Sequence, residues 1–216
     1  NDDNSLDPIY QKLTTSPLLH SKWTFRSVLV SIYTCFLCRP HSGMKYVNFF
    51  MKIAKLPTNP FISKDYVLTF TNNFFLYQLY RSGFIDIESI YEQSSRSSKM
   101  VKYFYPEIQK KFPNIIQLKS AVKSVKKHVY RFNCTFEDDD SIINKFIELR
   151  SKGENPDPIC QSIRHDDVER LQQLLSQTNV PVDKKIEHSI FERFIFINDV
   201  ILPTLIEYAA FFGSIE

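Results

Sequence analysis

Glycine and cysteine are both scarce in this sequence of 216 residues, which contains four of each. A glycine-rich phosphate-binding loop or a β fold with many tight hairpins requires more glycine than this. We therefore expect neither kind of structure. The few cysteines are interpreted as reduced thiols, as is usual in a reducing compartment.

Long apolar runs are also missing. The first residues are acidic and polar, unlike the basic and then apolar start of a signal peptide. The longest apolar stretch, residues 28–38, is interrupted by Ser31 and Thr34 and is shorter than the roughly 18 residues that a membrane span requires. We predict no membrane span and a cytoplasmic location. Because the chain begins with Asn1, it is interpreted as a fragment of a longer protein.

The residue patterns that support catalysis or metal binding are incomplete. Cys35 and Cys38, followed by His41, have zinc-like spacing, but a second pair of ligands is missing. Three aspartates at 138–140 lack the alternation and the glycine of a calcium loop, and suit a helix start. His165 precedes two aspartates, yet adjacent residues of a helix do not face one another. We predict a non-enzymatic protein with no catalytic residues, no cofactor and no metal.

Aromatic residues, by contrast, are abundant, with 19 Phe and 11 Tyr. Apolar spacing at three and four residues predicts helices over most of the chain. The expected helices cover residues 9–13, 22–38, 45–55, 64–81, 86–92, 98–111 and 138–152. The helix at 64–81, capped by Ser63 and ended by Gly83, is apolar almost all round and is predicted to be central and buried. Pro106 should kink or end the helix at 98–111.

Two features of the organisation follow from the pattern. Residues 115–132 allow a helix, although residues 129–132 alone could form a strand, and this alternative stays open. Residues 153–158 hold a glycine, two prolines and two acidic residues, which is typical of a boundary. We therefore predict an all-α chain with a helical domain at 1–152 and a second region at 153–216.

Charge is distributed unevenly along the chain. Residues 96–134 contain ten Lys and Arg and one acidic residue, whereas residues 135–216 contain eight Lys and Arg and sixteen acidic residues. On a helix, one face of the basic segment would carry Lys119, Lys123, Lys126, Lys127 and Arg131. This face is either a surface for phosphate, acidic peptide or anionic lipid, or a solvated face that pairs with the acidic third of the chain. Nucleic acid is not expected as a partner, since no recognised module accompanies the charge.

The last thirteen residues, TLIEYAAFFGSIE at 204–216, resemble the start of an ankyrin repeat. The positions that match the repeat pattern are Thr204, Ala209, Ala210, Gly213 and Glu216. Thr204 would open the turn before the first helix, the two alanines would let neighbouring helix pairs stack closely, and Gly213 would permit the turn between helices. Leu205 and Glu207 stand where the family has proline and histidine.

Residues 158–175 look like a second, weaker unit with two helices. The matching residues Glu169 and Glu216 lie 47 positions apart, whereas the family repeat is about 33 residues long. The excess is assigned to an extra helix at 186–196. Together with the aromatic-rich helical region before it, this end of the chain is similar to the expanded ankyrin-repeat families of flagellate protists.

The resemblance implies protein–protein recognition, with a partner that the sequence does not identify. Residues 153–216 would be an atypical first repeat pair that caps an array continuing beyond Glu216. Three apolar side chains would then lack part of their packing and be partly exposed, which favours self-association. They are Phe211, Phe212 and Ile215. Two alternatives remain: a purely structural cap for the array, and binding to an anionic surface through the basic segment 96–131.

Overall fold

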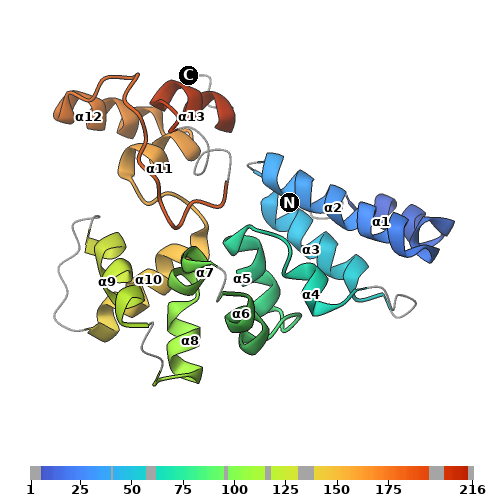
Figure 1. Ribbon diagram of the computed structural model, residues 1–216. Helices are drawn as coiled ribbons and strands as arrows, with labels where there is room; N and C mark the ends of the chain where they lie inside the picture. The colour runs from blue at the N-terminus through green and yellow to red at the C-terminus, as the bar shows by residue number, and fades with distance from the viewer. Residues whose placement is uncertain are drawn as a thin grey trace. The chain divides into compact units, whose positions relative to one another are not determined.

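The computed structural model describes residues 6–39, 41–56, 62–94, 97–114, 118–130, 139–194 and 202–213, except for the side chains at 118–120, 122 and 139. Every regular element in these ranges is helical, and the extended chain contributes one isolated antiparallel bridge, between Lys185 and Thr204 (Figure 1). The all-α prediction is confirmed. No helix in the described ranges has the length and apolarity needed to cross a membrane.

The chain divides into two compact units, Asn1–Ile90 and Tyr91–Glu216. The boundary predicted from the sequence, between residues 152 and 153, falls inside the second unit. The helix that ends at Lys152 contacts residues that lie before this boundary and residues that lie after it. Arg150 Nη1 donates to Glu107 Oε2 at 2.8 Å, and the ring of Phe146 lies 5.3 Å from that of Phe191.

Phenylalanine rings fill the core of the first unit. Its helices are α1 (Asp7–Thr14), the 3-10 helix η2 (Pro17–His20), α2 (Lys22–Cys38), α3 (Gly43–Ala54), α4 (Lys64–Val67) and α5 (Asn73–Arg81). Phe75 of α5 lies at the centre, with ring centroids 5.2 Å from Phe36 of α2 and 5.0 Å from Phe50 of α3. All three side chains are fully buried, so the aromatic abundance of the sequence is used in this core.

The single helix predicted at 64–81 is wrong, because the chain leaves the helical path between α4 and α5. Asn72 starts a new helix there: its side chain accepts a hydrogen bond from the Phe75 N–H at 2.9 Å. The Asn72 N–H is itself bound to the Tyr33 hydroxyl at 3.0 Å, which fixes the break. The predicted cap at Ser63 and the burial of the 74–79 stretch are both confirmed.

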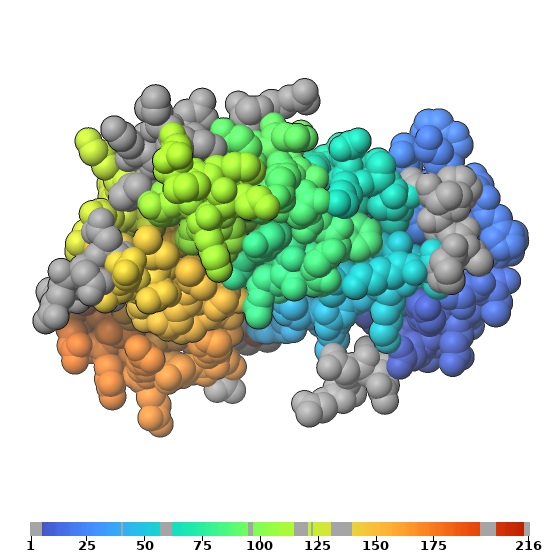
Figure 2. Space-filling view, turned by 90° about the horizontal axis from the view of Figure 1, so that it is seen from below, coloured from blue at the N-terminus to red at the C-terminus, as the bar shows by residue number. Residues whose placement is uncertain are grey.

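The second unit begins within α6 (Ile87–Ser94) and continues with α7 (Ser98–Tyr103), α8 (Tyr105–Lys111), α9 (Leu118–Tyr130) and α10 (Asp139–Lys152). The predicted interruption near Pro106 is confirmed, since α7 ends before Phe104 and α8 starts with Pro106 in its first turn. Residues 118–130 are helical, which resolves the described part of the 115–132 ambiguity in favour of helix. Figure 2 shows the lime-green α8 beside the gold α10 on the surface of this unit.

The C-terminal part of this unit contains α11 (Pro158–Arg164), α12 (Val168–Thr178) and α13 (Leu205–Phe212). The helix α11 packs against both α12 and α13 (Figure 1). Their shared core is made of buried apolar residues from all parts of the segment: Cys160, Ile163, Ile186, Phe194, Leu205, Tyr208 and Phe212.

The extra helix predicted at 186–196 is wrong over residues 186–194, and residues 195 and 196 lie outside the described ranges. The chain here is not helical, because its backbone pairs with the residues that lead into α13. The Ile186 N–H donates to the Pro203 carbonyl at 2.7 Å, and the Leu205 N–H donates to the Lys184 carbonyl at 3.1 Å. Beyond this bridge, the side chains of Phe191 and Phe194 are buried in the interior of the unit.

Candidate functional site

Side-chain caps define the helical hairpin α11–α12. Asp157 Oδ1 accepts hydrogen bonds from the N–H groups of Ile159 and Cys160 at the start of α11. Asp167 caps α12 by accepting from the Arg170 N–H at 3.1 Å. Between the helices Asp166 has a φ of 55°, the left-handed conformation that a tight turn requires and that aspartate tolerates. The hairpin is therefore specified locally by its three aspartates.

The residues that carry the repeat resemblance lie on and around α13. Thr204 caps this helix and forms a capping box with Glu207: the Thr204 N–H donates to the Glu207 carboxylate at 2.8 Å, and the Glu207 N–H donates to the Thr204 hydroxyl at 3.2 Å. Gly213 ends the helix with a φ of 72°. Ala209 is half-buried against the core and Ala210 is exposed. Glu216 lies outside the described residues.

The prediction that aromatic side chains at this end of the chain are incompletely packed is wrong for Phe212. Its side chain is only 3% exposed and belongs to the shared core. The guanidinium of Arg164 lies 4.3 Å from the centre of its ring, which is the geometry of a cation–π contact. Phe211 is half-buried against the same core, and Ile215 lies outside the described residues.

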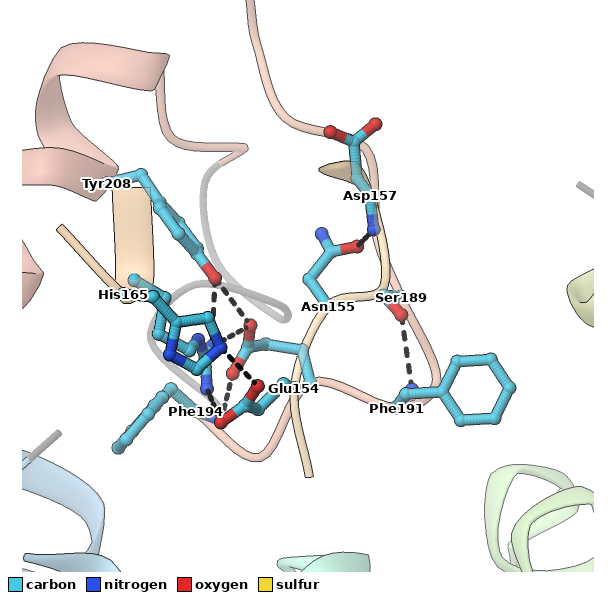
Figure 3. A network of polar contacts seen from close by, with 10 residues as sticks. Glu154, Asn155, Asp157, His165, Ser189, Phe191, Phe194 and Tyr208 are labelled. Carbon is cyan, nitrogen blue, oxygen red and sulfur yellow. Dashed lines mark hydrogen bonds and ion pairs between the residues drawn. The ribbon is translucent and has the colours of Figure 1, made fainter. Parts of the chain in front are cut away.

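A buried polar network, which was not predicted from the sequence, joins α11, the non-helical segment before α13 and α13 itself. Arg164 Nη2 donates to Glu192 Oε2 at 2.6 Å and to the Tyr208 hydroxyl at 2.8 Å, and the Tyr208 hydroxyl donates to Glu192 at 3.1 Å (Figure 3). Arg164 is 6% exposed, Glu192 7% and Tyr208 0%. The three groups come from positions 28 and 16 residues apart, so no local motif marks them.

Burial controls the titration of these groups. It raises the pKa of the Tyr208 hydroxyl, and the nearby Glu192 carboxylate raises it further. For Arg164, burial opposes the charge, but Glu192 and Tyr208 outweigh it, so the pKa of the guanidinium is raised. The network thus joins the Arg164 guanidinium to the Glu192 carboxylate and to a tyrosine hydroxyl whose ionisation is opposed by burial. Since its members are almost inaccessible to solvent, it holds three segments together and presents no reactive group at the surface.

An open groove lies beside the network and is lined by His165, the histidine that precedes two aspartates in the sequence. His165 Nε2 lies 3.5 Å from Glu154 Oε2, and the histidine side chain is 62% exposed. Figure 3 shows His165 beside Glu154. Asp166 instead forms the turn and Asp167 caps α12. The neighbouring Ser162 hydroxyl donates to the Pro158 carbonyl, so it is used in the helix.

The predicted basic face lies on α9, opposite a buried stripe of Ala121, Val125 and Val129. Lys123 and Lys127 are exposed, and Lys126 is half-buried. The Lys119 side chain and Arg131 lie outside the description of the structure. The described lysines therefore point away from the core of the unit, as the helical spacing predicts.

Metal ligands do not gather in the part of the chain that the structure describes: no group of three or more His, Cys, Asp or Glu side chains there could hold an ion. Cys35 is half-buried and Cys38 is exposed near the end of α2.

Comparisons with known proteins give no relative from which a function could be carried over. No family model matches the chain, and neither a curated protein nor a solved structure matches it.

Proposed function

We propose that this chain is a non-catalytic protein-binding module, and that its C-terminal helices form the beginning of an ankyrin-like helical array. The observation that carries the proposal is the composition of α13, which is apolar on both sides. One side, with Leu205, Tyr208 and Phe212, is buried on α11 and its surroundings. The other side exposes Ile206, whose side chain is 57% accessible, together with Ala210.

Glu207 is the single charged side chain of α13, and a helix that is apolar over most of its surface is expected to have neighbours on both sides. In a helical repeat array each inner helix packs between the inner helices of the repeats before and after it. The contact of α11 with α13 supports such an arrangement, because two helices, each preceded by a side-chain cap, lie next to each other. We name the exposed residues Ile206 and Ala210 the α13 outer face.

The buried network supports the same proposal. A buried ion pair contributes little net stability compared with apolar packing, but it fixes which segments come together. Here it orients α13 relative to α11, and so determines how the α13 outer face is presented. The chemistry of the network also favours binding over catalysis, because its charged residues, Arg164 and Glu192, are enclosed.

The test is quantitative capture of partner proteins by the purified full chain from an extract of the source cells. The variant Ile206→Glu with Ala210→Glu places charge on the α13 outer face without touching buried residues. We expect partners held by the wild-type chain to be lost with this variant, while its melting temperature stays unchanged. The matched control is Lys22→Glu, an exposed position at the start of α2.

A second candidate function is binding to an anionic surface through α9, favoured by the exposed Lys123 and Lys127 opposite the buried stripe. The variant Lys123→Glu with Lys127→Glu belongs in the same experiment. If capture is lost with this variant and kept with the α13 variant, the anionic-surface candidate replaces the first. If all variants capture the same proteins in the same amounts, both candidates fail and a structural cap remains.

A further inference from the structure

A small pocket opens between α11, the segment at 180–187 and the start of α13, and it is not lined by Ile206 or Ala210. Its cavity volume is about 90 Å³. A single water molecule requires roughly 10–15 Å³ on this scale, so the cavity accepts a group of several heavy atoms. Apolar walls come from Cys160, Ile186 and Leu205, which are 1%, 7% and 7% exposed.

One buried polar side chain lines this pocket with an unused donor group. Asn155 is 4% exposed, and its Oδ1 accepts from the Asp157 N–H at 3.1 Å. Figure 3 shows the amide nitrogen of Asn155 on the side away from that hydrogen bond. The NH₂ group can donate hydrogen bonds, so it favours a ligand that brings an oxygen to this pocket.

The charged side chains of the pocket favour an anionic oxygen. Lys184 and Lys185 line it together with Asp157 and Glu187. The Asp157 carboxylate already accepts two N–H groups at the start of α11, where the helix dipole also offsets its charge. Two basic residues, Lys184 and Lys185, and the Asn155 amide therefore line a pocket in which one of the two carboxylates is already engaged.

We propose that this pocket binds a carboxylate carried on a small aliphatic group. The carboxylate accepts hydrogen bonds from the Asn155 amide and from Lys184 and Lys185, and the aliphatic group lies against Ile186 and Leu205. Two sources have this chemistry: a free short-chain acid, and the C-terminus of a polypeptide that ends in an aliphatic residue. The proposal stands independently of the α13 outer face and of its partner.

The test is a titration of the ¹⁵N-labelled full chain, followed by backbone amide chemical shifts. The ligands are isovalerate, its uncharged amide, and an acetylated peptide ending in valine with either a free or an amidated C-terminus. We expect saturable shifts around Cys160, Lys185 and Leu205 with isovalerate, and binding at least about tenfold weaker with the amide, because hydrogen bonds to a charged group are lost. Binding of the free-ended peptide identifies a polypeptide C-terminus as the source, and binding of isovalerate alone identifies a free acid.

Variants test whether Asn155, Lys184 and Lys185 bind the carboxylate. Asn155→Asp keeps the acceptor for the Asp157 N–H and replaces the donor with a second acceptor, so isovalerate should bind at least about tenfold more weakly. Lys184→Gln with Lys185→Gln changes only exposed side chains, and should weaken binding about three- to tenfold. Lys123→Gln on α9 is the matched control and should change nothing.

Three results would overturn the proposal. They are the absence of saturable shifts, equal affinity for isovalerate and its amide, or unchanged affinity in the two lysine substitutions. Because the lysine variant alters only exposed positions, it decides the question even if Asn155→Asp does not fold.

Discussion

At the scale of single residues, Arg164 is the side chain on which the C-terminal helices depend most. It is bound to Glu192 and Tyr208, and its guanidinium also lies over the ring of Phe212. Glu192 and Tyr208 are both buried, so neither can turn to water if the arginine is lost.

Replacing Arg164 with leucine is expected to lower the free energy of unfolding by about 3–5 kcal/mol, because the buried Glu192 loses the arginine of its ion pair. The double variant Arg164→Leu with Glu192→Leu should lose less than the sum of the two single variants, since it removes both charges. Tyr208→Phe, which removes only a hydroxyl, should lose about 1–2 kcal/mol. Urea unfolding at neutral pH measures all four proteins. Additive losses in the double variant would contradict a coupled network.

Glu207 provides a pH-dependent prediction at the same scale. The N–H and the hydroxyl of Thr204 both donate to its carboxylate, and they lower its pKa below the ordinary value of 4.5. A carboxyl with a lowered folded-state pKa contributes stability that is complete above its unfolded-state pKa. That contribution is lost as the pH falls through the lower folded-state value.

Glu207→Gln should therefore flatten the loss of stability between roughly pH 5 and pH 3, compared with the wild type. The measurement is the urea midpoint at a series of pH values. Asp183→Asn, at an exposed turn position, is the matched control and should follow the wild-type curve. A Glu207→Gln curve that also follows the wild type would show that the ionised form of Glu207 adds no stability to the capping box.

At the scale of elements, the interruption between α4 and α5 depends on Asn72. Its side chain caps α5 and is only 3% exposed, so no water can replace the bond to the Phe75 N–H. Asn72→Ala should destabilise the protein by about 0.5–2 kcal/mol, and Asn72→Asp, which keeps an acceptor, should lose less. Chemical denaturation compares the variants. An unchanged midpoint for Asn72→Ala would mean that the helix restarts without its cap.

Helices were predictable where the local pattern was sufficient. The start of α4 at Ser63, the break before α8 at Pro106 and the end near Gly83 all depend on residues within a few positions. The helix predicted at 186–196 failed because its apolar side chains, among them Ile186, Phe191 and Phe194, are buried by a chain that is not helical. Its partners at 203–205 are distant in the sequence, and local spacing does not contain them.

In the candidate sites, too, the features that depend on nearby residues were predictable and those that depend on distant residues were not. Thr204 and Gly213 were predictable because they act on the helix next to them. The network of Arg164, Glu192 and Tyr208 was not, because its geometry arises only when three segments pack together. A strongly apolar segment that still contains a charged residue, such as Glu192 beside two phenylalanines, was the available signal.

At the scale of the whole molecule, the two compact units should respond separately to destabilisation. Arg164→Leu is expected to accelerate hydrogen exchange throughout residues 91–213 and to leave residues 6–90 nearly unchanged, because each unit has its own core. Exchange read by mass spectrometry in mild urea measures this. Acceleration confined to residues after 152 would support the division predicted from the sequence, and uniform acceleration would mean that the chain unfolds as one unit.

The central claim is that the α13 outer face contacts another protein, and site-specific photo-crosslinking tests it most directly. A photoreactive amino acid is placed at Ile206 in the full chain, and for comparison at Lys123 on α9 and at Lys22 on α2. All three side chains are exposed. The account predicts that position 206 crosslinks to a discrete protein partner and that positions 123 and 22 do not. Crosslinks that arise only from position 123, or equally from all three positions, would contradict it.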